Sequence, residues 1–298
     1  MSAEQPKIEQ SNNEAELSLL FEQQYDNPEI VDIDQQKLEI VDLQPPQPKT
    51  EVPMVMVPGW AATPEVLREN AIILAKLGRR VILPNSPHGL EIEKTTGRNY
   101  PLAELRKTAA LLQSIEHKQL NEVDAVSHSE AGIFLTIAAL ENSDKFRNLV
   151  LVSPAGLTGK DSFSRLASGF SHDIAGQTVK ALLHEPNHLG KIGTAFWEAM
   201  KAIASDPKKT WEEVMAMVNY QIPELLAELK QQGHGISIIH GAQDKAFPME
   251  RVQQMVNSGL VDGFISVKGS HNELYLNPQP ITEWVDHLLD AMEKKTPK

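Results

Sequence analysis

The sequence predicts an α/β protein in which a doubly wound, mostly parallel sheet has helices on both faces and an inserted helical cap. Short apolar runs typical of strands recur at residues 53–57, 81–83, 123–126, 149–152, 236–239 and 264–267. Segments with helical spacing of apolar residues separate most of these runs, and parallel strands need such crossover connections. Between about Gly156 and Gly233 helical spacing dominates and no convincing strand is present, which indicates the cap.

Length and composition agree with this class. The chain has 298 residues, of which 41% are hydrophobic and 23% charged, as in ordinary globular proteins. Its net charge of -12 disfavours binding to nucleic acid and to anionic lipid, because both depend on clustered Lys and Arg. The chain has no cysteine, which excludes disulfides and Cys-ligated metal sites. No apolar run approaches the roughly 20 residues of a membrane-spanning helix, and the first twenty residues do not resemble a signal peptide, so we expect a cytoplasmic protein.

The residues before the parallel strands fall into two parts. Residues 1–27 are polar with scattered apolar positions, and we expect a flexible tail that contains one short helix. From Glu29 apolar and polar residues alternate, as in two short antiparallel strands, and the proline-rich segment 44–48 ends them. We therefore divide the chain into the tail (1–27), the first part of the core (28–155), the cap (156–232) and the second part of the core (233–298).

Helix signals lie between the predicted strands. One helix is expected over 64–77, because Thr63 can cap it, Pro64 suits its first turn and Gly78 can terminate it. A second is indicated by apolar residues that recur every three or four positions between 102 and 112. In the cap, the apolar stripes at 196–203 and 211–218 either pack inside the protein or line a substrate pocket, and both interpretations remain open.

A candidate nucleophile follows the strand at 123–126. The next residues, Ser-His-Ser-Glu-Ala-Gly at 127–132, lead into an apolar helical segment. A serine at the apex of such a strand-turn-helix unit is held in a strained conformation with its hydroxyl presented above the sheet. The segment resembles the nucleophile elbow of the α/β-hydrolase family, whose pattern is Gly-x-Ser-x-Gly, with Ser127 and Ala131 at the two glycine positions. The resemblance implies that Ser129 is the nucleophile, although a generic turn capped by a serine is the alternative.

Two later segments resemble the parts of the family that supply the acid and the base. The strand at 236–239 leads to Gly241-Ala-Gln-Asp244-Lys-Ala-Phe-Pro248, similar to the family segment Gly-x-x-Asp-x-x-x-Pro, which implies that Asp244 is the acid. The strand at 264–267 leads to Gly269-Ser-His271, similar to the Gly-x-His loop of the family, which implies that His271 is the base. The order Ser, Asp, His is that of the family, and each residue follows the carboxyl end of a predicted parallel strand, where such sheets bind their ligands.

The resemblance also implies an oxyanion hole built from two backbone amides. One amide would belong to Glu130, directly after the nucleophile. The other would belong to Trp60 in the turn Pro58-Gly59-Trp60, which is similar to the His-Gly-x-x turn of the family. The loop that contains His88 is similar to a structural loop of the family and receives no catalytic role.

Three further sets of residues are less suited to the chemistry. Some members of the family have their acid after the strand that corresponds to 149–152, and Asp161 is the nearest carboxylate there. His128 and His240 flank strand ends where the family has no base, so we expect structural roles for these two histidines. The segment His184-Glu-Pro-Asn-His188 fits the His-Glu-x-x-His pattern of zinc proteases. Pro186 disfavours the continuous helix that this pattern needs, so we predict a short turn there and no metal site.

The resemblance implies a serine hydrolase that cleaves a carboxylic ester of a small molecule through an acyl-enzyme, without a metal or an organic cofactor. A peptidase, thioesterase, C–C bond hydrolase or acyltransferase would use the same three residues, whereas dehalogenases and epoxide hydrolases of this fold have aspartate at the elbow. Alternatives from other classes are a ligand-binding protein of the same fold with little turnover and an interaction protein that acts through its tail. The oligomeric state and the substrate are not determined by these patterns.

Overall fold

The structure is a computed structural model of the chain and describes residues 5–33, 36–86, 98–157 and 162–294. Its centre is an eight-stranded sheet in the order β1-β2-β4-β3-β5-β6-β7-β8. β2 runs antiparallel to β1 and β4, and all other neighbouring strands are parallel, which confirms the mostly parallel sheet. The strands are β1 (Glu29–Ile33), β2 (Gln36–Leu43), β3 (Met54–Val57), β4 (Val81–Pro84), β5 (Val123–His128), β6 (Phe146–Val152), β7 (Gly235–Gly241) and β8 (Gly263–Val267).

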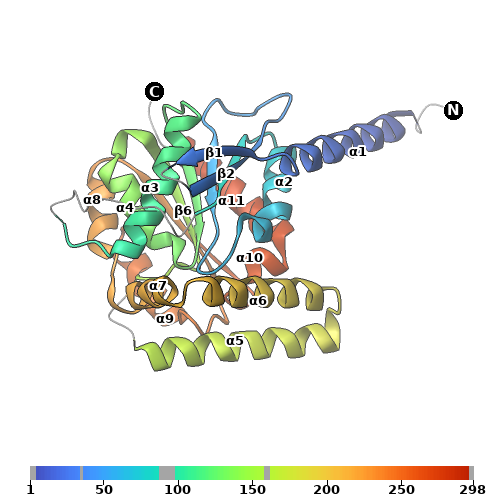
Figure 1. Cartoon of the computed structure of the whole chain (residues 1–298). Helices are drawn as coiled ribbons and strands as arrows, with labels where there is room; N and C mark the ends of the chain where they lie inside the picture. Colours follow the sequence, from blue (N-terminus) through green and yellow to red (C-terminus); the bar gives the residue numbers. More distant parts are fainter. Residues whose placement is uncertain (1–4, 34–35, 87–97, 158–161, 295–298) are drawn as a thin grey trace.

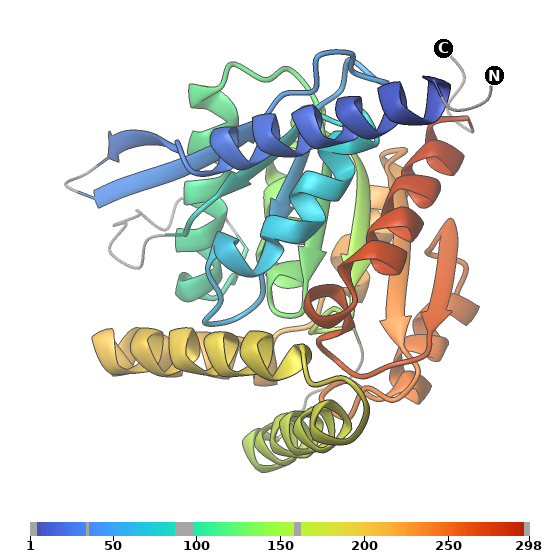
Figure 2. The same ribbon diagram turned by 90° about the vertical axis from the view of Figure 1, so that its right-hand side faces the viewer.

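Helices cover both faces of this sheet, which confirms the doubly wound architecture (Figures 1 and 2). One face is covered by α1 (Gln5–Tyr25), α2 (Arg68–Lys76) and α11 (Pro278–Glu293). The other face is covered by α3 (Leu102–His117), α4 (Ala131–Glu141), α8 (Pro223–Gln231) and α9 (Met249–Asn257). The short helices are η1 (Pro64–Leu67), η2 (Ser143–Lys145) and α10 (Glu273–Leu276).

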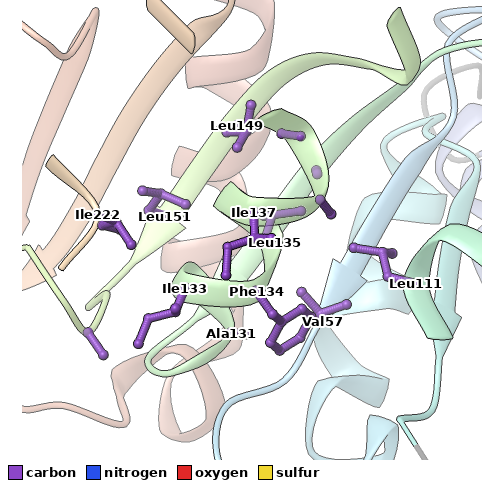
Figure 3. Close-up of a cluster of buried hydrophobic side chains, with 14 of the residues drawn as sticks. Val57, Leu111, Ala131, Ile133, Phe134, Leu135, Ile137, Leu149, Leu151 and Ile222 are labelled. Carbon is purple, nitrogen blue, oxygen red and sulfur yellow. The ribbon is translucent and has the colours of Figure 1, made fainter. Parts of the chain in front are cut away.

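Each parallel strand contributes to two separate hydrophobic cores, because its side chains alternate between the two faces. In β3, for example, Val55 and Val57 belong to the core under α3 and α4, while Met54 and Met56 belong to the core under α2 and α11. Helix α4 lies between the sheet and its neighbouring helices, and its residues from Ala131 to Leu140 are all buried (Figure 3). The segment directly after the candidate nucleophile is therefore part of the rigid core.

The N-terminal region differs from the flexible tail with a short helix that the sequence led us to expect. α1 is a single helix of 21 residues, and Phe21 and Tyr25 near its end are buried. Arg68 of α2 pairs with Glu22 and Asp26, at 2.5 and 2.7 Å. Fully burying a Phe side chain stabilises a fold by about 1.5–3 kcal/mol, so the end of α1 is anchored to the core.

Between β6 and β7 the described residues form helices and no strand. These are α5 (Phe163–His184), α6 (His188–Ser205), α7 (Pro207–Asn219) and α8. Figure 1 shows α5, α6 and α7 together below the sheet and its flanking helices. α8 instead packs on α4 and β7 with Leu225, Leu226 and Leu229 in the core, so it belongs to the layer that covers the sheet. We call α5, α6 and α7 the insert helices. None of the helices that the structure describes is both long and apolar enough to span a bilayer.

Candidate active site

The tight turn after β5 holds Ser129 in the left-handed region of the backbone. Ser129 has φ of +56°, which a residue with a side chain rarely adopts and which costs free energy unless its surroundings enforce it. Two hydrogen bonds fix this turn, from the Ser129 amide to the Val152 carbonyl and from the Ala155 amide to the Ser129 carbonyl, both at 3.0 Å. The chain then continues directly into α4, as in a strand-turn-helix unit.

The two departures from the glycine pattern are accommodated in this turn. Ala131 and Ser127 are both buried, and the Ser127 hydroxyl has no hydrogen-bond partner among the described residues. The residue after Ala131 is tightly packed, because a Cβ added to Gly132 would lie 3.0 Å from the Pro154 Cβ. Serine and alanine therefore fit at their positions, while the glycine that the close approach of the β6 loop favours is Gly132.

Ser129, His271 and Asp244 form a continuous hydrogen-bonded chain. His271 Nε2 lies 2.9 Å from Ser129 Oγ, and His271 Nδ1 lies 2.9 Å from Asp244 Oδ2. The three residues come from the ends of β5, β7 and β8 and are 142 and 27 positions apart along the chain. All three are buried. The topology of the sheet brings them to one edge, as predicted from their places after parallel strands.

The loop after β7 fixes the orientation of Asp244. Its Oδ1 accepts a hydrogen bond from the Phe247 amide at 2.8 Å, which leaves Oδ2 for His271. Burial by itself would raise the pKa of Asp244, but the positive charge of His271 and the two hydrogen bonds outweigh it and lower this pKa. His240 holds the same loop, because its Nε2 donates to the Phe247 carbonyl at 2.7 Å. Asp244 is thus kept as a carboxylate.

Close contacts also hold the backbone of the loop that carries His271. A Cβ added to Gly241, at the end of β7, would lie 2.4 Å from the Ser270 carbonyl oxygen, so only glycine allows this approach. His128 Nε2 donates to the His271 carbonyl at 2.9 Å. Burial, together with the charge of His271, lowers the pKa of His128 to about 3, so His128 is a neutral donor. His128 and His240 therefore have the structural positions expected of them.

Apolar rings surround the imidazole of His271. Phe170 and Phe247 each have ring centroids 5.2 Å from that of His271, and the His128 ring lies at 4.8 Å. His271 is 2% exposed. In such a water-poor environment, hydrogen bonds and charges act more strongly than at a surface.

The turn after β3 lies against the nucleophile. A Cβ added to Gly59 would lie 3.0 Å from Ser129 Cβ, which places the Gly59-Trp60 peptide beside the hydroxyl-bearing side chain. The Gly59 amide donates to the Tyr275 hydroxyl at 3.1 Å. Within the described part of the chain, the amides of Trp60 and Glu130 donate to no backbone oxygen. The two N–H groups that the sequence suggested for an oxyanion thus belong to two turns, one after β3 and one after β5, that meet at Ser129.

The insert helix α5 contributes contacts that the sequence reasoning missed. Asp173 accepts hydrogen bonds from the Lys245 and Ala246 amides at 3.0 and 3.1 Å, directly after Asp244. Gln177, four residues later, donates to Ser270 Oγ at 2.7 Å, directly before His271. The signal was present as two polar residues in phase with the buried Leu166 and the half-buried Phe170 of α5. The sequence does not show what α5 packs on, so the partners of Asp173 and Gln177 could not be inferred from that signal.

Among the residues without a predicted catalytic role, Asp161 and His88 lie outside the described residues. α5 ends at His184 and α6 begins at His188, so the two histidines of the zinc-like pattern belong to different helices, as predicted. His188 Nδ1 instead contacts the Glu185 carboxylate within the turn, at 2.9 Å.

Comparisons with known proteins show that this chain has the α/β-hydrolase fold. No protein-family model matches the chain, and no curated protein matches it by sequence. Solved structures match this chain over most of its length. A hydrolase from Pseudomonas aeruginosa PA01 has a TM-score of 0.63 at 14% identity, over 88% of this chain and 98% of its own. A thermophilic esterase from Thermogutta terrifontis has a TM-score of 0.62 at 14% identity, over 89% and 99%. An enol-lactonase from Burkholderia xenovorans LB400 has a TM-score of 0.64 at 10% identity, over 88% and 100%.

Proposed function

We propose that this protein is a serine hydrolase that cleaves a carboxylic ester through an acyl-enzyme on Ser129. The observation that supports the proposal most is the hydrogen-bonded chain from Asp244 through His271 to Ser129, with both contacts at 2.9 Å. A serine hydroxyl is a weak nucleophile at neutral pH, and such a chain is what activates it. The fold shared with an esterase, a hydrolase and an enol-lactonase agrees with this proposal.

In the proposed mechanism, His271 Nε2 removes the Ser129 proton while Oγ attacks the carbonyl carbon of the ester. Asp244 keeps the other proton of the imidazole on Nδ1 and stabilises the imidazolium that forms. The amides of Trp60 and Glu130 donate to the oxyanion of the tetrahedral intermediate. His271 then protonates the leaving alcohol, and the acyl group remains on Ser129.

A water molecule completes the cycle. His271 removes a proton from this water, which attacks the acyl carbon, and the same two amides stabilise the second oxyanion. His271 returns its proton to Ser129 Oγ as the acid leaves. The rings of Phe170 and Phe247 limit bulk water around the imidazole, which favours these charge-dependent steps.

We propose that the insert helices form the cap of this site and select the substrate. α5 contacts the loops of both Asp244 and His271, so a substrate must fit between these loops and the helices. The chemistry at Ser129 is common to esters, thioesters, amides and acyl transfer, and the residues of the triad do not distinguish among them. A panel of ester, thioester, amide and C–C bond substrates would identify the preferred class.

Labelling with a fluorophosphonate tests the proposal, because the probe reacts only with an activated serine. We expect the folded protein to be labelled on Ser129 and to hydrolyse p-nitrophenyl esters, and Ser129→Ala to lose both. Absence of labelling and of turnover in correctly folded protein would refute the enzyme and favour a ligand-binding protein of this fold. Labelling that persists in Ser129→Ala would assign the nucleophile to another residue.

A further inference from the structure

A cluster of buried charged residues lies next to the nucleophile turn and takes no part in the steps above. Lys107 of α3 has its Nζ 2.6 Å from Oε1 of Glu130 and 3.1 Å from Oε1 of Glu213. Glu130 directly follows Ser129, and Glu213 belongs to the insert helix α7. The Lys107 side chain is 12% exposed and the two glutamate side chains 0% and 5%. One ammonium group thus joins the nucleophile turn to an insert helix away from solvent.

Glu104 completes this cluster from the preceding turn of α3. It is fully buried, and no donor among the described residues reaches either of its carboxyl oxygens or the second oxygen of Glu130. Burial raises the pKa of Glu104 well above its usual value, and the negative charge of Glu130 raises it further. A protonated Glu104 has an O–H that can donate a hydrogen bond to Oε2 of Glu130. The Glu130 side chain is then held from both sides.

The charges show that Lys107 is the centre of the cluster. Burial would lower the pKa of Lys107, but Glu130 and Glu213 outweigh burial and raise it, so the ammonium stays charged. Without it, Glu130 and Glu213 would lose the ammonium that they share in a buried site, and burial already raises the pKa of Glu213 to about 7. A buried ion pair is weak evidence of net stability, and in some proteins it instead fixes the arrangement of its partners.

We propose that Lys107 is a positioning residue that couples the insert helix α7 to the nucleophile turn through its simultaneous contacts with Glu213 and Glu130. This inference rests on the proposed function, because the position of the Glu130 amide affects the reaction rate only if an oxyanion forms there. The Glu130 side chain and that amide belong to the same residue, so a fixed side chain restricts rotation of the peptide that must meet the oxyanion. Small displacements of such donors are costly to catalysis.

The chain offers a matched control on the same two helices. Arg106, the neighbour of Lys107, pairs with Glu212, the neighbour of Glu213, at 2.9 Å. This pair also ties α3 to α7, but among the described residues it forms no hydrogen bond or ion pair with the nucleophile turn. Figure 1 shows α7 below α3 and α4, and the pairs of Lys107 with Glu213 and of Arg106 with Glu212 link the same two helices, α3 and α7. Loss of the control pair loosens α7 without freeing Glu130.

The test compares Lys107→Met and Arg106→Gln with wild type, by ester kinetics and by amide hydrogen exchange without substrate. We expect Lys107→Met to lower kcat and the fluorophosphonate labelling rate by about tenfold or more, with KM changed by less than about threefold. Exchange should become faster at both 127–132 and 207–219. For Arg106→Gln we expect faster exchange at 207–219 alone and kcat within about twofold of wild type.

Three outcomes would overturn the inference: an unchanged kcat in Lys107→Met, a change confined to KM, or faster exchange confined to α7. If Lys107→Met does not fold, Glu130→Ala tests the inference instead. This variant removes the contact between Lys107 and the nucleophile turn, while the pair of Lys107 with Glu213 remains. The same loss of kcat is then expected, and wild-type kcat would refute the inference. If wild type is not labelled, the proposed function fails, whereas the exchange comparison still decides whether Lys107 couples the two segments.

Discussion

Replacing Asp244 by Asn is the sharpest perturbation of the candidate triad, because the two side chains have the same shape. The structure dictates how the new amide must sit. One oxygen of residue 244 accepts the Phe247 amide at 2.8 Å, and only the carbonyl oxygen of asparagine can keep this contact. The NH2 group of asparagine then faces His271 Nδ1, where Asp244 Oδ2 now lies at 2.9 Å. A donor in that place forces Nδ1 to accept and leaves the imidazole proton on Nε2.

The size of the effect follows from this tautomer. With a proton on Nε2, His271 can no longer accept the proton of Ser129 across the 2.9 Å contact, and the imidazolium also loses its counter-charge. A change of this kind lowers kcat by roughly 10⁴-fold in serine proteases, which corresponds to about 5.4 kcal/mol of transition-state stabilisation. The fold should persist, since every hydrogen bond of the loop except the one to His271 is retained.

Asp173→Asn is the matched control for this experiment. Asp173 is also a buried carboxylate beside the loop, but within the described part of the chain its Oδ2 accepts the Lys245 and Ala246 amides, and the carbonyl oxygen of asparagine can do the same. We expect its kcat to stay within about threefold of wild type, measured by steady-state hydrolysis of a p-nitrophenyl ester at neutral pH. If Asp244→Asn keeps more than about a tenth of the activity, or if both variants lose activity equally, the assignment of Asp244 as the acid is wrong.

Three further predictions follow from the surroundings of the nucleophile. Gly59→Ala places a Cβ 3.0 Å from Ser129 Cβ and 3.1 Å from His128 Nδ1, so kcat for the ester should fall by about tenfold or more; wild-type kcat would contradict the packing. Ser127→Ala removes a buried hydroxyl without a partner among the described residues, and we expect urea denaturation to show an unfolding free energy equal to wild type or up to about 1 kcal/mol higher. A loss of stability would mean that this hydroxyl has a partner. The pKa of His128 is about 3 in the folded protein against a usual 6.5, so the unfolded chain binds more protons between these values, and the unfolding free energy should fall as pH drops from about 6.5 toward 3. His128→Gln should make this pH dependence shallower, and an identical slope would assign it to other groups.

Much of the parallel sheet could be predicted because its strands have a strong local signature. Strands buried on both faces are continuous apolar runs, as at 123–126 and 149–152, and the helices between them end at recognisable residues such as Gly78. The candidate triad followed from topology rather than from any single motif. Because parallel strands have their carboxyl ends at one edge, three residues placed after three such strands must converge there.

The packing of the N-terminal helix α1 and of α8 could not be predicted, for a common reason. Helical spacing indicates which face of a helix is apolar but not which surface that face meets. Phe21 and Tyr25 lie in a segment that is polar on average, and their burial depends on the presence of α2 and β2. α8 has the spacing of an insert helix, yet it packs on α4 and β7.

The sequence by itself determined the mostly parallel sheet, the strand-turn-helix unit around Ser129 and the order in which Asp244 and His271 follow it. These features depend on local patterns and on the direction of the chain. Only the tertiary structure decided that Asp173 braces the loop of the acid and that Lys107 joins the nucleophile turn to α7. A buried charge or polar group is defined by the partners that surround it, and those partners come from distant parts of the chain, so no local pattern specifies them.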